Sequence, residues 1–395
     1  MQRRESMETV KIADQYFNNC RDIVLRNPNL IATVVRYKVF AREDGIVAGS
    51  NRAVAFISEN TFGPLRIMAL KDGEAFKSGD PVLIIEGLFM ELVNLETTYL
   101  GFLSYSGAAT AMKEIVDVAG AIPVVDMSAR HFPWNIIEEA ALAAYLGGAA
   151  GTSTQAGYNY VQRFYNPGDA FRLYASLPHA MAAVVSHMAE EENIFPSVAA
   201  AMLFHETYPN KPITVLVDFE GRELDVAKQA FEVFGDKLFA VRLDTHGGRQ
   251  LQGTHDPTDF HMLESYFRKK TGLILNSTMR VFENKYGMEI GTSEKYFFGN
   301  GVTAEATFVI RDYLDSIGAN NVKIVVSSGF NKKKVAAFKK VNAPMDFIGT
   351  GSWIRFAMFT SDISHVKENG EWVYRTKVGR KHGNGDELKL AYERA

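Results

Sequence analysis

The middle of the chain alternates short runs of apolar, mostly β-branched residues with amphipathic stretches of helical spacing. The runs are Ile122–Met127, Ile213–Phe219, Leu238–Asp244, Val322–Gly329 and Asp346–Ser352. Strands that are apolar throughout are buried on both faces, and intervening helices let them pair in parallel as βα units. The pattern therefore predicts an α/β fold, arranged either as a doubly wound sheet or as a barrel.

Polar residues at the C-terminal ends of these predicted strands favour the barrel. They are Asp126, Asp218, Arg242, Asp244, Ser328 and Gly349. In a barrel these strand ends meet at one rim, where the loops build a common site. Any one of them alone could simply cap the next helix. Because they recur at the same place, we predict an irregular (β/α) barrel over residues 121–360 with a site at its rim.

Residues 1–120 predict a separate N-terminal α/β region that contains a small β-roll. Between Ile31 and Gly87 the apolar runs are short, and Asp72-Gly73 is typical of a tight strand connection. The segments interpreted as strands are VVRYKVF, AVAFISE, PLRIMAL and DPVLIIEG. The spacing of apolar residues from Glu91 to Val118 predicts a helix. Residues 361–395 are expected to form a C-terminal extension that packs back on this region.

Charge and cysteine content narrow the class of function. The 43 basic and 46 acidic residues give a net charge of −3, which offers no electrostatic footprint for nucleic acid or an acidic membrane. Cys20 is the single cysteine, so one chain can form neither a disulfide framework nor a cysteine-rich zinc site. No segment is long and apolar enough to span a bilayer. We expect a cytoplasmic protein that acts on a small molecule.

Two small-residue turns follow the last two predicted strands, at VVSSGF and FIGTGSW. Turns of this kind that lead into helix N-termini expose backbone N–H groups and hydroxyls, which suit a phosphate monoester. The predicted phosphate-binding residues are Ser328, Gly329, Gly349, Thr350 and Gly351. One such turn is weak evidence, but two on neighbouring strands favour a phosphate pocket.

Charged side chains complete the predicted site. His179 follows Pro178 at a predicted helix start, where the helix dipole would stabilise a phosphorylated ring; an ordinary hydrogen bond is the alternative. The planar guanidinium of Arg130 can bind pyrophosphate or a carboxylate, or it can form a surface salt bridge. Arg242 and Asp244 suit a ribose hydroxyl or a magnesium–polyphosphate complex, or they pair with each other.

Taken in order, these motifs resemble the nicotinate phosphoribosyltransferase family over nearly the whole chain. The matching segments are Asp14-Gln15-Tyr16, Glu96-Thr97, Met127–His131, Tyr145–Thr154, LPHA, VRLDT, SSGF and GTG. The resemblance implies a type II phosphoribosyltransferase fold in a homodimer or higher oligomer with shared sites. It also implies a reaction of NAD salvage, in which nicotinate and phosphoribosyl pyrophosphate give nicotinate mononucleotide and pyrophosphate. ATP hydrolysis would drive this reaction through a phosphohistidine at His179.

Further roles follow from the resemblance alone. Tyr16 of the partner subunit would stack on the pyridine ring, and Arg130 would hold pyrophosphate or the nicotinate carboxylate. Arg242 and Asp244 would contact ribose and the Mg²⁺ carried by the diphosphate, with no other metal site implied. Asp218 would orient the catalytic histidine.

Ser153 bears on the choice of substrate. The nicotinamide-using relatives carry Asp at the matching position, which would repel a carboxylate. Serine therefore points to nicotinate, although its hydroxyl could instead cap a helix.

Several departures from the family pattern leave alternatives open. Met127 and His131 replace the family's usual Phe and second arginine, and Ala175-Ser176 replaces its Gly-Thr. The segment from Gly247 to Gly299 is longer than in compact members and is expected to form a lid or an interface. The alternatives are a quinolinate phosphoribosyltransferase, which decarboxylates a diacid without ATP, and a non-catalytic nucleotide-binding relative.

Overall fold

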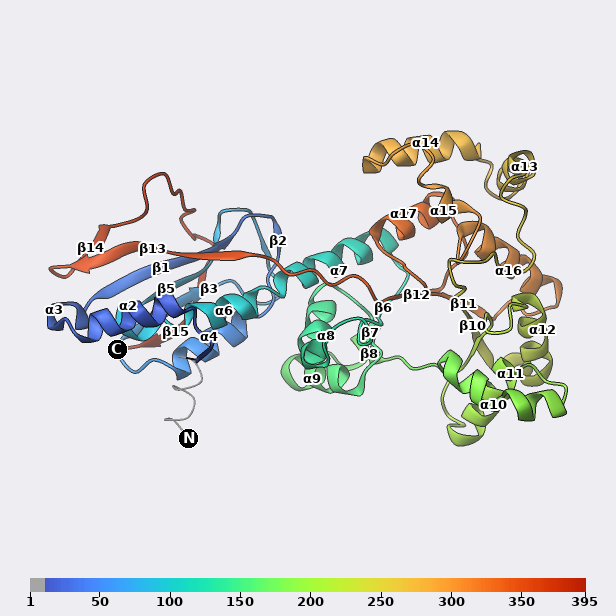
Figure 1. Ribbon diagram of the computed structural model, residues 1–395, viewed down its shortest axis with the longest axis horizontal. Coiled ribbons are helices and arrows are strands. Elements are labelled where there is room, and N and C mark those ends of the chain that lie inside the picture. The colour runs from blue at the N-terminus through green and yellow to red at the C-terminus, as the bar shows by residue number, and fades with distance from the viewer. Residues whose placement is uncertain (1–10) are drawn as a thin grey trace. The chain divides into compact units, whose positions relative to one another are not determined.

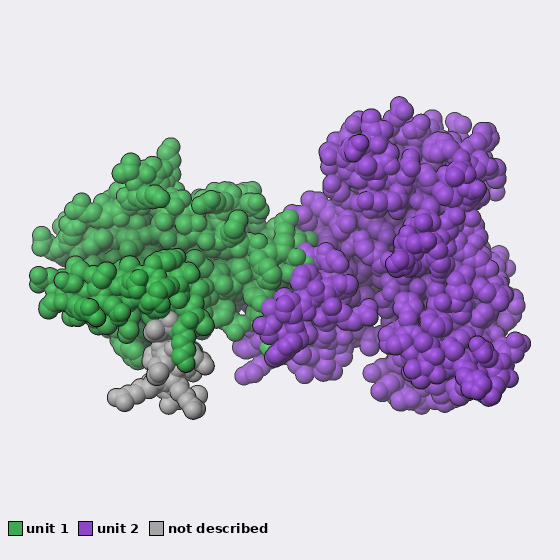
Figure 2. Space-filling view, in the orientation of Figure 1, with its two compact units in different colours: residues 1–113, 138–148, 354–395 green, residues 114–137, 149–353 purple. Residues whose placement is uncertain are grey.

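The computed structural model describes residues 11–395, which divide into two compact units (Figures 1 and 2). The first, here called the sheet unit, comprises, of the described residues, 11–113, 138–148 and 354–395. The second, the barrel unit, comprises residues 114–137 and 149–353. Both units are therefore assembled from segments that are distant in the sequence.

An antiparallel sheet forms the centre of the sheet unit. Within the described residues it has six strands in the order β14-β13-β1-β5-β3-β15. Their bounds are β1 (Val34–Ala41), β3 (Leu65–Ala69), β5 (Pro81–Leu88), β13 (Phe359–Glu368), β14 (Glu371–Tyr374) and β15 (Lys389–Arg394). A separate short pair joins β2 (Gly45–Ile46) to β4 (Ala75–Phe76). Strand β1 lies between β5 and β13, so the C-terminal part of the chain completes a sheet that the N-terminal part begins.

The helices of the sheet unit correct two predictions. They are α2 (Gln15–Leu25), α3 (Pro28–Ile31), α4 (Ser50–Glu59), α5 (Phe89–Leu92), α6 (Glu96–Leu103) and α8 (Ile137–Leu146), and α7 (Ser106–Ala119) contains the division between the units. The segment AVAFISE, interpreted as a strand, lies in α4. Its Ala53 and Ile57 are both buried and stand four residues apart, so they share one face of a helix.

The helix predicted from Glu91 to Val118 is instead divided into α5, α6 and α7. Between α6 and α7 the carbonyl of Ser104 accepts a hydrogen bond from the N–H of Ala357 at 2.8 Å. A Cβ atom at Gly107 would lie 2.4 Å from that same nitrogen. The close approach of the segment before β13, which is distant in the sequence, therefore accompanies the break in the helix here, and local spacing could not reveal it.

A parallel sheet forms the centre of the barrel unit. In residues 11–395 it has seven strands in the order β8-β7-β6-β12-β11-β10-β9. Their bounds are β6 (Val124–Asp126), β7 (Gly151–Thr152), β8 (Arg172–Leu173), β9 (Ile213–Leu216), β10 (Leu238–Leu243), β11 (Lys323–Val326) and β12 (Phe347–Thr350). The predicted α/β class and irregular barrel are confirmed, and the barrel is an open half-barrel. Buried Val125, Val241 and Ile348 fill its strands, which confines polar groups to the strand ends.

Helices connect and cover these strands (Figure 1). They are η1 (Trp134–Ile136), α9 (Gln155–Tyr165), η2 (Gly168–Ala170), α10 (His179–Glu191), α11 (Pro196–Thr207), α12 (Glu223–Phe234), η3 (Gly235–Lys237), α13 (Phe260–Thr271), α14 (Leu275–Tyr286), α15 (Glu294–Phe297), α16 (Ala304–Ser316) and α17 (Lys332–Lys340). The long segment from Gly247 to Gly299 builds α13, α14 and α15. From residue 11 onward, no helix combines the length and hydrophobicity that crossing a bilayer requires.

Candidate active site

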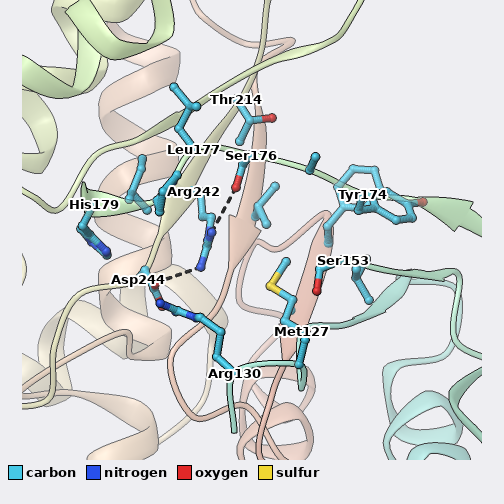
Figure 3. Close-up of a pocket in the computed structure, with 18 of the residues that line it drawn as sticks. Met127, Arg130, Ser153, Tyr174, Ser176, Leu177, His179, Thr214, Arg242 and Asp244 are labelled. Atoms are coloured by element: carbon cyan, nitrogen blue, oxygen red, sulfur yellow. Dashed lines mark hydrogen bonds and ion pairs between the residues drawn. The ribbon is translucent and has the colours of Figure 1, made fainter. Parts of the chain in front are cut away.

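A cavity of about 460 Å³ opens at the ends of the parallel strands (Figure 3). Residues that follow β6, β7 and β10 line it, together with the segment from Tyr174 to Ala180. The predicted site residues in its wall are Arg130, Ser153, His179, Arg242, Asp244 and Gly349. The barrel unit thus brings together polar residues from four separate stretches of sequence.

Arg242 is held on all three of its guanidinium nitrogens. Its Nη2 donates to Oδ2 of Asp244 at 2.8 Å, its Nη1 to Oγ of Ser176 at 3.1 Å, and its Nε to Oγ of Ser327 at 3.0 Å. The Ser327 hydroxyl in turn donates to Oδ1 of Asp244 at 2.8 Å. Arg242 and Asp244 therefore pair with each other, one of the two alternatives left open above. A charge pair fixed in this way presents a preorganised field to a ligand.

His179 is the first residue of α10, and its ring contacts a buried carboxylate. Nε2 of His179 lies 2.9 Å from Oδ2 of Asp218, which follows β9. The His179 side chain is 42% exposed and that of Asp218 only 6%. The buried carboxylate therefore holds one edge of the ring, and the rest of the ring stays accessible to solvent. Burial raises the pKa of the Asp218 carboxyl, and the hydrogen bond from His179 opposes that rise. Arg249 donates from Nη2 to the backbone carbonyl of Asp218 at 2.8 Å.

The two sides of the cavity differ in character. In Figure 3 the Arg130 side chain extends toward Asp244, on the same side as His179. Among residues 11–395 no carboxylate forms an ion pair with Arg130, so the surface salt bridge considered above is not formed. On the other side lie Ser153, Met127 and Tyr174.

Aromatic rings form much of the cavity wall on the side of Ser153 and Tyr174. Tyr174 and Phe239 each contact Phe347, with ring centroids 6.1 and 5.8 Å apart. A charged half beside an aromatic half suits a ligand that joins anionic groups to a flat ring. The sequence prediction missed these rings because each lies at an ordinary apolar position of a strand or its flank.

The two predicted phosphate turns are tied to each other. Gly349 lines the cavity, but the buried Thr350 donates its hydroxyl to the carbonyl of Phe330 at 2.7 Å, which joins the two turns. A Cβ atom at Gly351 would lie 2.8 Å from the His131 ring. Ser328 and Gly329 both have positive φ, 73° and 72°. The Thr350 hydroxyl is therefore already occupied as a donor, whereas the backbone groups of the turns can be offered to a ligand.

Lys334 was missed by the sequence prediction, although it lies beside one of these turns. Its side chain is buried, and Nζ donates to the carbonyl of Ser328 at 2.8 Å. Burial lowers the pKa of Lys334 to about 8, and the Asp244 carboxylate opposes this shift. Its place directly before the apolar run VAAF, on the inner face of α17, was the available signal.

The remaining predicted residues lie elsewhere or have structural partners. Tyr16 belongs to α2 of the sheet unit, is 59% exposed and donates to Oδ2 of Asp14 at 3.3 Å. Asp126 accepts hydrogen bonds from the Ser128 N–H, the Thr152 hydroxyl and the Trp353 indole, so its carboxylate is occupied by structural partners and caps no helix.

The described residues form no group of three or more His, Cys, Asp or Glu side chains that could hold a metal ion. Mg²⁺ is commonly bound by one or two carboxylates together with substrate phosphates. Asp244 fits that arrangement, in which the ion arrives on a diphosphate and meets a single carboxylate.

Comparison with known proteins gives two kinds of match in sequence. Residues 14–106 match the family model described as the quinolinate phosphoribosyl transferase N-terminal domain. The chain is also 27% identical over 253 residues to nicotinate phosphoribosyltransferase pncB1 of Mycobacterium tuberculosis. That match covers 57% of this chain and 53% of the relative, so the chain spans about half the length of the curated relative that it matches.

Solved structures extend the likeness to almost the whole chain. The nicotinate-nucleotide pyrophosphorylase of Pyrococcus furiosus superposes with a TM-score of 0.69 at 25% identity, over 96% of this chain and 80% of that one. Human nicotinic acid phosphoribosyltransferase shares the fold, with a TM-score of 0.57 at 14% identity over 90% of this chain and 75% of the human chain. These likenesses confirm the type II phosphoribosyltransferase fold that the motifs implied, and they bear out the resemblance to that family.

Proposed function

We propose that this protein is a nicotinate phosphoribosyltransferase of NAD salvage, which couples ATP hydrolysis to the formation of nicotinate mononucleotide and pyrophosphate. The observation that carries the proposal is that His179, which lines the cavity together with Arg130, Arg242 and Asp244, pairs behind that wall with the buried Asp218. A phosphoribosyl transfer that does not use ATP forms no phosphohistidine, and it would give His179 no role.

The contact with Asp218 selects the nucleophilic nitrogen of His179. A carboxylate that accepts a hydrogen bond from Nε2 keeps the proton on that nitrogen and leaves the lone pair on Nδ1. Nδ1 would attack the γ-phosphorus of ATP, the bond to the β-phosphate oxygen would break, and ADP would leave. Water later cleaves the phosphorus–nitrogen bond and releases phosphate. The start of α10 stabilises the anionic phosphoryl group meanwhile.

Transfer of the ribose needs a different set of charges. The ring nitrogen of nicotinate would attack C1 of phosphoribosyl pyrophosphate while the bond from C1 to the pyrophosphate oxygen breaks. Arg130 is free of ion pairs in the described chain and would bind the departing pyrophosphate. Mg²⁺, carried in on the diphosphate, would neutralise part of its charge. Asp244, fixed by Arg242, would face the ribose as C1 becomes cationic.

Quinolinate phosphoribosyl transfer is the second candidate, because residues 14–106 match the N-terminal domain model of that enzyme. That match concerns the sheet unit, whereas the histidine pairing belongs to the barrel unit. A diacid would also bring a second carboxylate to the cavity, and the side chains of Ser153 and Met127, which lie on its aromatic side, carry no positive charge to meet it. For this reason nicotinate is the preferred substrate.

One assay separates the candidates. The protein is incubated with Mg²⁺ and phosphoribosyl pyrophosphate, with and without ATP, and with nicotinate, nicotinamide or quinolinate in turn. We expect nicotinate mononucleotide and ADP to form together with nicotinate. Product and carbon dioxide from quinolinate without ATP would establish the second candidate. A lack of product with every substrate, despite binding of nucleotide, would indicate a non-catalytic relative.

A further inference from the structure

The turn after β11 holds a residue in a backbone conformation that side chains disfavour. Ser328 has a φ of 73°, and Gly329 follows with 72°. Glycine adopts this left-handed region freely, but a residue with a Cβ atom does so at a cost and only where its surroundings hold it there. The Ser328 hydroxyl supplies one contact, a bond of 3.3 Å to the carbonyl of Thr245.

The second and shorter contact comes from Lys334. Its Nζ donates to the Ser328 carbonyl at 2.8 Å and lies 4.5 Å from the centre of the Phe330 ring. A buried ammonium is costly unless it is hydrogen-bonded, and here it is placed against a carbonyl and a ring of the turn itself. Lys332 and Lys333, on the same helix, are exposed. The buried lysine is therefore distinguished from its neighbours by its position against the turn.

The contact between Lys334 and the Ser328 carbonyl also sets the direction of the next N–H group, that of Gly329. In a planar trans peptide the carbonyl oxygen of one residue and the N–H of the next point in opposite directions, and the described chain has no cis peptide bond. Lys334 fixes the Ser328 carbonyl on its own side, so the Gly329 N–H is directed to the other side. Within the described chain that N–H donates to no acceptor.

Two of the first amides of α17 are already occupied as donors. Oδ1 of Asn331 already accepts the N–H groups of both Lys333 and Lys334, each at 3.0 Å. The Asn331 side chain thus caps the helix, and the first amides after Ser327 that have no acceptor within residues 11–395 are those of Ser328 and Gly329.

We propose that Lys334 is a positioning residue that holds the Ser328–Gly329 peptide so that the Gly329 N–H faces a phosphate group of the substrate. This inference rests on the proposed function, in which the substrate is phosphoribosyl pyrophosphate. Lys334 itself acts through the turn, and its charge reinforces the site for an anion.

The test compares Lys334→Met with Lys333→Met, a matched change of an exposed lysine one residue away. Binding of ribose 5-phosphate is measured by calorimetry, and steady-state rates are measured with phosphoribosyl pyrophosphate and Mg²⁺. We expect Lys334→Met to weaken binding of ribose 5-phosphate and to raise the KM for phosphoribosyl pyrophosphate by about tenfold, the equivalent of one lost hydrogen bond to a charged group. The kcat at saturation should change far less, and Lys333→Met should match the wild type.

A rescue variant distinguishes positioning from general stabilisation. Glycine occupies a φ of 73° without penalty, so Ser328→Gly should restore part of the affinity when it is added to Lys334→Met. Thermal unfolding checks that each variant is folded. If Lys334→Met does not fold, Lys334→Gln takes its place, and the same loss is expected because its shorter amide cannot reach the Ser328 carbonyl.

Equal affinity of the wild type and a folded Lys334 variant for ribose 5-phosphate would overturn the inference and leave the proposed function standing. Failure of the wild type to bind either ribose 5-phosphate or phosphoribosyl pyrophosphate would overturn the proposed function itself.

Discussion

Ring nitrogen Nδ1 of His179 is the atom on which the proposed coupling to ATP depends. We predict that His179→Ala abolishes ATP hydrolysis and acid-labile phosphorylation, because no other group replaces the nucleophile. Some slow transfer to nicotinate should remain, since Arg130, Arg242 and Asp244 are untouched. His187→Ala, at an exposed position of the same helix, is the control. Unchanged ATP hydrolysis in His179→Ala would remove the phosphohistidine from the mechanism.

Ser153 offers a test of substrate choice, because it lines the cavity beside Met127. A carboxylate introduced by Ser153→Asp would face the nicotinate carboxylate without a compensating charge but could accept the amide N–H of nicotinamide. We predict that the kcat/KM for nicotinate falls by about tenfold or more relative to that for nicotinamide, a difference of ~1.4 kcal/mol. Ser153→Ala is the control. Equal losses for both substrates would mean that Ser153 has only a structural role.

The candidate site could be read from the sequence where a polar residue interrupts an apolar pattern. His179, Arg242 and Asp244 stand out in this way, at a helix start and a strand end. Their supporting partners do not, because contact depends on the folded chain: Ser176 and Ser327 lie 66 and 85 positions from Arg242. Lys334 stands in a run of three lysines, and only its place directly before the apolar run VAAF distinguishes it from the other two.

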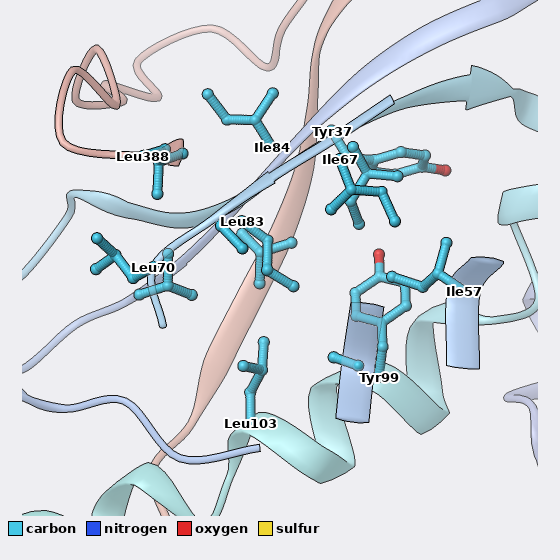
Figure 4. Packing of buried hydrophobic residues seen from close by; sticks show 14 of the residues in the cluster. Tyr37, Ile57, Ile67, Leu70, Leu83, Ile84, Tyr99, Leu103 and Leu388 are labelled. Atoms are coloured by element: carbon cyan, nitrogen blue, oxygen red, sulfur yellow. The ribbon is translucent and has the colours of Figure 1, made fainter. Parts of the chain in front are cut away.

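At the scale of elements, helix α6 begins with Glu96, whose carboxyl group is largely shielded from water, so that its charged form is disfavoured. Burial raises the pKa of Glu96 from 4.5 to about 8, and the carboxylates of Asp362 and Asp14 add to the shift. It lies near Tyr99 and Tyr37, which belong to the buried cluster of the sheet unit (Figure 4). The folded state therefore binds this proton more tightly than the unfolded state does.

The sign of the pH dependence follows from that difference. Between about pH 4.5 and about pH 8 the folded state retains the Glu96 proton that the unfolded state has lost, so stability falls as the pH rises through this window. We predict that Glu96→Gln flattens the decline, matching the wild type at the acid end and exceeding its melting temperature above about pH 8. Glu59→Gln, at an exposed end of α4, is the control. Parallel curves for Glu96→Gln and the wild type would contradict the prediction.

The elements that local pattern predicted well are those with a strong period of their own. The helix from Glu223 to Phe234 and the strands β9 to β12 stand where the sequence indicated. The two-residue strands β7 and β8 are too short to show any period. AVAFISE was misread because its apolar residues fit both a strand and a helix, and only burial of Ala53 with Ile57 decides between them.

At the scale of the whole molecule, the family resemblance predicts that two subunits share each active site. His179→Ala and Tyr16→Ala should each be close to inactive in coupled turnover if one subunit supplies the histidine and the partner supplies the tyrosine. After the two variants are mixed and exchange subunits, half of the dimers are heterodimers, and each of these regains one intact site. Coupled activity should recover to about a quarter of the wild type, as two-fold symmetry requires.

Subunit exchange is verified separately with labelled chains. Exchange that restores no activity would mean that Tyr16 serves the site of its own subunit. A single variant mixed with itself is the control.

The strand order of the antiparallel sheet also bears on the order in which the two units can fold during synthesis. Strand β3 pairs with β15, and Arg394 donates to the carbonyl of Gly63, 331 positions earlier in the chain. Strands β1 and β3 emerge early, yet β1 has an edge that stays unpaired until β13 is synthesised, and β3 has one that stays unpaired until β15 is synthesised. During that interval the nascent chain carries open sheet edges, a form prone to pair with other chains. The barrel unit, whose last strand ends at Thr350, contains neither β13 nor β15. It can therefore fold before the antiparallel sheet is complete.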